Sequence, residues 1–448
     1  MRGTVSLSLL ASALVVNAMA ADSLESAFKE GKASGQIRAF YIDRDYHGYS
    51  NATNIHRDGL AVGGYLKYET GSFNGFSAGA AFYTTNKMDG KSSTAGENDT
   101  TLFGANGENN SYLGEGYIQY KNGNTTFKAG RQKLDTPMAG SDDARMLPNL
   151  FEAYVLSNTD VKDTTLIAAH VTKFAAGTFA NAYNFTSGTS GQTLALTSGY
   201  SGATNATNMV GHFEDMGTYA IGHETNGVSV AAAIYSGVPG LKVQVWDYYA
   251  HDILNAIYAE SNYGWSMGNG VAPYLAVQYI KEDDIGNSYA SKVNSDFIGA
   301  KAGVKVANFD IYGAISHNSK DSSATIKGGT ISPWGGMPAY TQGMVSRHQF
   351  MAGTDALKVA GSYDWKNLGV NLNTAVYYVS FDMDRLNGYS DASASDKSTE
   401  SGFDVIYNPE MVKNLQLRFR GNFPRHFKET TSGDVSWDEY RFIANYNF

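Results

Sequence analysis

Apolar and polar side chains alternate along most of this 448-residue chain. Segments of roughly ten residues carry an apolar or aromatic side chain at every second position, and turn residues separate these segments. A period of two predicts β-strands with one apolar face and one polar face. The predicted strands begin near Gln36, Leu60, Phe73, Gly114, Thr125, Phe151, Asp163, Leu241, Leu254, Val271, Phe297, Phe309, Leu357, Val370, Phe403, Leu415 and Trp437, and another lies within 216–236.

The connections between these segments differ in length. Short ones lie at 122–124, 307–308 and 366–367, and long ones lie at 85–113, 132–149, 174–215, 318–356, 381–400 and 423–435. Short turns at one end and long loops at the other are typical of a transmembrane barrel. The predicted fold is therefore all-β, a transmembrane antiparallel β-barrel, and we expect some of its long loops to fold into the lumen.

The number of strands depends on the region 216–236, which contains two candidate segments, Thr218–Glu224 and Val228–Tyr235. Counting both gives an odd number and places the chain ends on opposite sides of the barrel. Counting one gives an even number, as expected for such barrels. We predict 18 strands, so one of the two segments is not a strand.

The first 20 residues have the pattern of a secretory signal peptide. Arg2 supplies a positive charge, Val5 to Val16 form an apolar stretch, and Ala18-Met19-Ala20 provides a cleavage site. This stretch is too short to span a bilayer as a helix. We therefore expect residues 21–448 to form a single barrel domain after export.

Composition supports a barrel and limits the partners. The chain has 30 Tyr, 22 Phe and 49 Gly but 8 Pro, a mixture that suits alternating lipid-facing and lumen-facing strands. It has no Cys, so we expect a hydrogen-bonded wall rather than disulfides to stabilise it. Its net charge of −9 argues against nucleic acid as a partner.

The final segment shows the alternation clearly. Tyr440, Phe442, Ala444 and Tyr446 share one face, and the chain ends at Phe448. Such an end resembles the closing strand of outer-membrane barrels. This resemblance implies the outer membrane of a Gram-negative bacterium, with membrane lipid, lipopolysaccharide and the barrel-assembly machinery as partners, and leaves the oligomeric state, monomer or trimer, open.

Four segments are similar to one family, the OprD-type porins, or outer-membrane carboxylate channels. They are Gly35–Asp45, Gly130–Pro137, Asp142–Glu152 and Trp334–Thr341, and with the chain ends they extend over most of the predicted mature chain. The resemblance implies an 18-stranded barrel that inward loops make narrower. It also implies a row of wall arginines, the basic ladder, that draws carboxylate-bearing solutes through the channel.

Three arginines fit such a row. Arg418 and Arg420 share the polar face of 415–423, and the alternation places Arg441 on the polar face of the last strand. A charge facing lipid near the midplane costs about 2–4 kcal/mol, so we expect all three to face the lumen. They are predicted to bind carboxylate solutes; the alternative is that they pair with lumen acids such as Glu152.

Arg38 and Arg44 are further members of the predicted ladder. They share a face with Phe40 and Ile42, so the pattern leaves their orientation open.

Two segments are predicted to narrow the channel. The first, the loop from Lys133 to Asn149, carries opposed acids and bases, whose electric field would orient dipolar solutes. The second, 332–341, carries aromatic side chains. In the alternative, these residues form local turns and ion pairs, or a loop packed on the wall. The predicted constriction residues are Arg131, Lys133, Asp135, Asp142, Asp143, Arg145, Trp334 and Tyr340.

These features predict a diffusion channel for small carboxylate-bearing or zwitterionic solutes. One alternative is a general, non-specific major porin, and another is an outer-membrane hydrolase. The sequence contains no His-x-His or His-Glu-x-x-His motif, and no Gly-x-Ser-x-Gly motif indicates a catalytic nucleophile. We therefore expect no enzyme activity, no bound metal and no cofactor.

Overall fold

The computed structural model describes residues 21–48, 55–88, 98–104, 107–183, 208–336, 338–385, 397–430 and 433–448. The predicted signal peptide lies outside the described residues. Within the described ranges, no helix is both long and apolar enough to cross a membrane.

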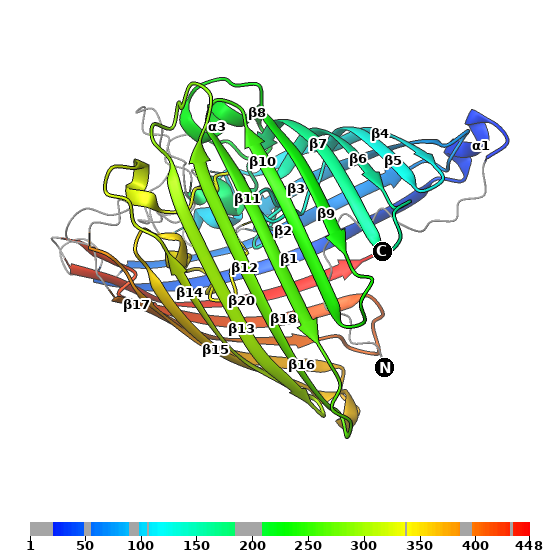
Figure 1. The fold of residues 1–448 in the computed structure, drawn as a ribbon. Coiled ribbons are helices and arrows are strands. Elements are labelled where there is room, and N and C mark those ends of the chain that lie inside the picture. Colours follow the sequence, from blue (N-terminus) through cyan, green and yellow to red (C-terminus); the bar gives the residue numbers. More distant parts are fainter. Residues whose placement is uncertain are drawn as a thin grey trace.

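Eighteen antiparallel strands form a closed barrel wall in the described part of the chain, as predicted (Figure 1). They are β1 (Lys32–His47), β2 (Ile55–Glu69), β3 (Phe76–Lys87), β4 (Asn110–Asn122), β5 (Thr125–Gln132), β6 (Leu150–Asn158), β7 (Thr164–Ala175), β9 (Val228–Tyr235), β10 (Leu241–Ala250), β11 (Leu254–Gly264), β12 (Val271–Asp284), β13 (Asn294–Val306), β14 (Phe309–Asn318), β15 (Asp355–Asp364), β16 (Leu372–Asp382), β17 (Lys397–Tyr407), β18 (Leu415–Arg425) and β20 (Gly433–Asn447). Two short strands, β8 (Phe213–Asp215) and β19 (Lys428–Thr430), extend it on the long-loop side.

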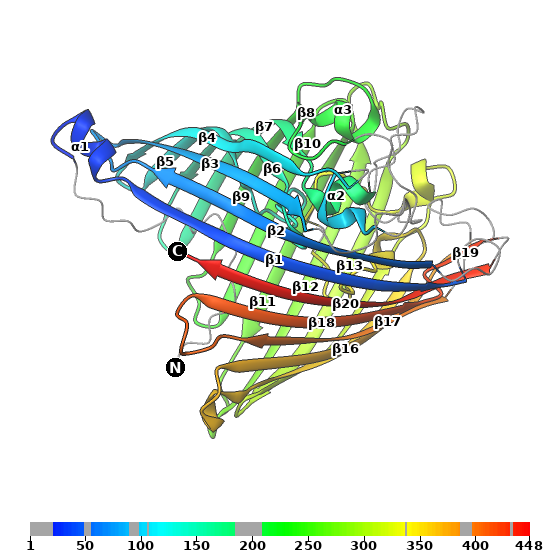
Figure 2. The same cartoon turned by 180° about the vertical axis from the view of Figure 1, so that it is seen from behind.

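The barrel closes between its first and last strands. Gln36 of β1 lies opposite Asn447 of β20, and the register continues to His47 opposite Ser436. Gly35 and Phe448 add two backbone hydrogen bonds of 2.9 and 3.1 Å beyond this register. Figure 2 shows β1 beside β20, with β18 next in the wall.

The helices of the described residues are short, and they belong to the segments that precede or connect the wall strands. They are α1 (Leu24–Lys29), α2 (Thr178–Tyr183) and α3 (Met216–Ile221), with 3-10 turns at Thr100–Leu102, Thr325–Gly328, His348–Phe350 and Trp365–Leu368. α3 decides the strand number. Asp215 caps this helix by accepting the N–H groups of Gly217 and Thr218, and Gly222 ends it at φ 72°. The candidate strand Thr218–Glu224 is therefore wrong, and Val228–Tyr235 is the barrel strand.

The alternation of side chains sets the two faces of the wall. On β20, Tyr440, Phe442 and Tyr446 are exposed on the outer face, whereas Glu439 and Arg441 are buried on the lumen side. An exposed apolar outer face is what a bilayer requires of such a wall.

Two long loops, 133–149 and 319–354, fold into the barrel. Met138, Trp334 and Phe350 of these loops share one buried apolar cluster with the wall residues Trp246 and Tyr258. Burial of apolar loop side chains against the inner wall stabilises the inward position of both loops.

Candidate functional site

The two inward loops meet inside the barrel. The N–H of Gly140 donates to the carbonyl of Trp334 at 3.1 Å, and Arg347 forms an ion pair of 2.7 Å with Asp142. The close approach needs glycine, because a Cβ on Gly336 (φ 84°) would lie 2.2 Å from the carbonyl oxygen of Pro137. The loops therefore form one narrowing layer, which we call the constriction.

The first loop is tied to the wall through Arg38 and Asp143. Arg38 of β1 faces the lumen, and its Nη1 lies 2.7 Å from Oδ1 of Asp143. Burial alone would raise the pKa of Asp143, but Arg38 and Lys133 together hold that pKa below its ordinary value. Asp143 is therefore ionised at neutral pH and holds the loop to β1.

A buried ion-pair network, centred on Glu439 of β20, provides a second tie. Arg44 donates to Glu439 at 2.6 Å, Arg145 of the first loop lies 3.4 Å from it, and Arg441 also binds it. Arg44 also pairs with Asp99 at 3.1 Å. Three guanidiniums thus surround the carboxylates of Glu439 and Asp99 and join β1, β20 and the first loop.

The second loop is tied down by Glu400 of β17. Its carboxylate accepts the N–H groups of Met344 and Ser346, each at 2.7 Å, and that of Val345 at 3.3 Å. The hydroxyl of Tyr377 donates to the same carboxylate. Three successive backbone donors on one carboxylate fix this part of the loop against the wall.

We expect the substitution Glu400→Gln to loosen the second loop. The amide has one acceptor oxygen and turns an NH₂ group toward backbone donors, and each buried donor left unpaired costs about 1–3 kcal/mol. Single-channel recordings should show more current fluctuation, and limited proteolysis should cut 319–354 faster. Asp310→Asn is the matched control, because Asp310 accepts from Tyr274 in the same way without touching this loop; equal effects of the two substitutions would contradict the anchoring role.

The predicted ladder arginines lie side by side in the lumen. Arg418 donates to Asp404 at 2.8 Å, and Arg420 lies 3.4 Å from the same carboxylate. Arg420 is directly opposite Arg441 in the β18–β20 register. The carboxylate of Asp404 thus pairs with both Arg418 and Arg420. Arg420 and Arg441, two like charges, face each other between β18 and β20.

The lumen also holds lysines that the sequence analysis missed. Lys301 of β13 lies 4.6 Å from the ring centre of Tyr340 on the second loop. Lys358 of β15 donates to the carbonyl of Gln342 at 2.5 Å and lies 5.0 Å from the Tyr377 ring centre. Both alternate with apolar neighbours, so the period of two could have placed them in the lumen.

The remaining predicted residues of the first loop have local roles. Asp135 accepts the N–H of Ser141 at 3.1 Å and so closes a turn within the loop. Lys133 lies 3.9 Å from Asp143.

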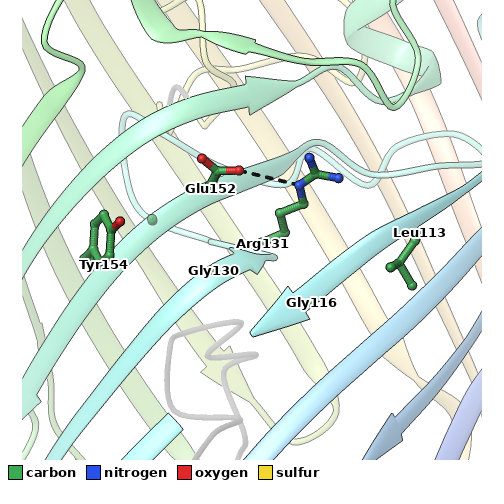
Figure 3. Close-up of a pocket in the computed structure, with 7 residues that line it drawn as sticks. Leu113, Gly116, Gly130, Arg131, Glu152 and Tyr154 are labelled. Atoms are coloured by element: carbon green, nitrogen blue, oxygen red, sulfur yellow. Dashed lines mark ion pairs between the residues drawn. The ribbon is translucent and has the colours of Figure 1, made fainter. Parts of the chain in front are cut away.

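The side chains of two predicted constriction residues have other positions than a lumen surface. Trp334 is 4% exposed and donates from Nε1 to the carbonyl of Met216 at 3.0 Å, so it fixes the second loop to α3. Arg131 lies opposite Glu152 on the outer face of the wall, which also carries the exposed Tyr154 (Figure 3).

One group of side chains in the described ranges has ligand atoms close enough together for a metal ion. It consists of Asp43, Asp45 and His56, on the outer face near the long-loop end of β1 and β2. Exposed acidic groups of this kind are common without a metal, and this one lies outside the lumen.

Comparison with known proteins agrees with this geometry. Residues 26–448 match the family model described as outer membrane porin, OprD family. A search of curated proteins finds no match. Among solved structures, Pseudomonas aeruginosa OpdK with vanillate has 16% identity and a TM-score of 0.73, covering 94% of this chain and 99% of that chain.

Two further Pseudomonas aeruginosa channels have the same fold. OccK2 (OpdF) in complex with glucuronate has 17% identity and a TM-score of 0.71, covering 94% of this chain and 98% of that chain. OccK9 (OpdG) has 19% identity and a TM-score of 0.72, covering 94% and 99%.

Proposed function

Because this chain belongs to the OprD family of outer membrane porins, we propose that it conducts small carboxylate-bearing or zwitterionic solutes by diffusion. As a member of that family, it is a β-barrel porin of the Gram-negative outer membrane. Porins are channels rather than enzymes. The substrate class is the proposed part, and it rests on the charges of the lumen.

The observation that carries the proposal is the pair Arg420 and Arg441. Nε of Arg420 and Nη2 of Arg441 are buried, and neither has a hydrogen-bond partner among the described residues. The Arg418 and Arg420 side chains are 27% and 17% exposed, so a carboxylate that passes this point can accept hydrogen bonds from them and offset the repulsion between Arg420 and Arg441. Lys301 and Lys358 add further positive charges to the lumen, next to the second loop.

The solved relatives support this choice of solute. OpdK was solved with vanillate and OccK2 with glucuronate, and each of these ligands carries a carboxylate. Their low identity to this chain leaves the particular solute to experiment.

The test compares solutes of matched size in liposomes that contain the purified protein. Glucuronate should enter faster than glucose, and its presence should block ion current in planar bilayers. Equal entry of charged and neutral solutes, without block, would favour a general porin instead.

A further inference from the structure

Beside β5, strand pairing in the barrel wall stops before the long-loop end of β4. β3 pairs with β4 up to Asn110, but β5 pairs with β4 only from Gly116 to Asn122. The half of β4 from Asn110 to Glu115 therefore has no partner strand on that side in the described part of the chain. Segment 208–213 approaches it instead, with Asn208 donating to the Asn110 side chain at 2.8 Å.

A pocket of about 370 Å³ opens where this pairing stops. Leu113, Gly116, Gly130, Arg131, Glu152, Ala153 and Tyr154 line it. Figure 3 shows Arg131 reaching toward Glu152, with Tyr154 on one side and Leu113 on the other. Leu113 and Tyr154 are 56% and 53% exposed on the outer face of the wall, so the pocket is reached from the lipid side.

Counted from the edge of the apolar band at its short-turn end, the length of β5 places the charged end of this pocket within the height of the bilayer. β5 has 8 residues. A strand of eight residues tilted by about 35–45° rises about 20 Å along the membrane normal, which is less than the height of the apolar band, roughly 25 Å. Arg131 is the residue before the last. Charged groups at such depth are rare in membrane proteins and are usually functional.

Lys173, just outside the pocket lining, adds a second cation to the pair of Arg131 and Glu152. Glu152 lies 3.5 Å from Nε of Arg131 and 3.8 Å from Nζ of Lys173. Two cations thus share one carboxylate. The Arg131 guanidinium lies 4.2 Å from the ring centre of Phe213, and its terminal nitrogens have no hydrogen bond within the described ranges.

From this geometry we propose that the pocket binds the head of a single-chain anionic amphiphile of the fatty-acid type. Arg131 and Lys173 bind its carboxylate, and the acyl chain follows the apolar outer surface past Leu113 and Tyr154. A single chain suits the small pocket. A lipid A molecule carries several acyl chains and is a poorer fit to a pocket of about 370 Å³.

The test uses a photoreactive palmitate with the full-length protein in nanodiscs. Labelled peptides should contain Leu113 or Tyr154, and unlabelled palmitate should compete while its methyl ester should not. Arg131→Gln should reduce labelling at least about tenfold, the loss expected for one charge-assisted hydrogen bond. Lys281→Gln is the control, because Lys281 is a cation on the same outer face, paired with Asp283 and Asp296 of β12 and β13.

Unchanged labelling of the folded Arg131→Gln variant would overturn the proposal, and so would competition by lipid A instead of palmitate. Ion selectivity of this variant should equal that of the wild type, because Arg131 lies outside the lumen. A failure of carboxylate transport would therefore leave this result unaffected.

Discussion

Replacing Glu439 by Gln is expected to loosen the first inward loop and to widen the channel. Glu439 holds Arg44, Arg441 and the loop residue Arg145 around one buried carboxylate. Without its charge, three guanidiniums repel one another, and breaking a buried ion pair in this way costs about 3–5 kcal/mol. Arg145 then loses its tie to β20, although its bond of 3.0 Å to Thr101 remains.

Single-channel recordings should show a higher conductance for Glu439→Gln, and thermal unfolding in detergent should occur at a lower temperature. Asp438→Asn is the matched control on the same strand. Asp438 pairs with Arg425 at a partly exposed site, where an ion pair contributes about 0–1 kcal/mol. If the two variants conducted alike, Glu439 would not hold the constriction.

The alternation of side chains accounts for most of what the sequence predicts correctly. It places strands close to their observed bounds, and it places Arg441 on the lumen side because Phe442 and Tyr440 face outward. The same rule would have placed Arg131 outside, since Phe127 lies four positions earlier and is exposed. Arg131 is among the predicted constriction residues because of the family resemblance of Gly130–Pro137 and not because of this local pattern.

Contacts between segments that are far apart in the sequence leave no comparable pattern in it. Glu439 joins Arg44, Asp99 and Arg145 through a network that spans nearly the whole chain. Long-range ion pairs leave no periodicity in a single sequence. The burial of Trp334 against α3 could not be predicted from the sequence for the same reason. A tryptophan in a loop suits a lumen surface and a packed core equally well.

Replacing the ladder arginines Arg418 and Arg420 is expected to have the second large effect, a change in ion selectivity. Arg418→Gln together with Arg420→Gln should move the reversal potential toward cations and slow carboxylate entry. The two side chains lie next to Arg441, and removing a charge-assisted contact of about 1.5–3 kcal/mol reduces solute binding roughly ten- to hundredfold. Barrel stability should change little, because both guanidiniums are partly exposed to the lumen.

Asp404 provides the opposite test at the same place. It is the carboxylate that Arg418 and Arg420 share, so Asp404→Asn should leave both guanidiniums in place and increase anion selectivity. Both shifts should shrink at 1 M salt, where the screening length falls from about 8 Å to about 3 Å. Lys366→Gln, in a short turn outside the lumen, controls for the loss of charge alone. If the double variant folds and keeps its reversal potential, these arginines brace the wall, and the proposal of carboxylate transport loses its main physical support.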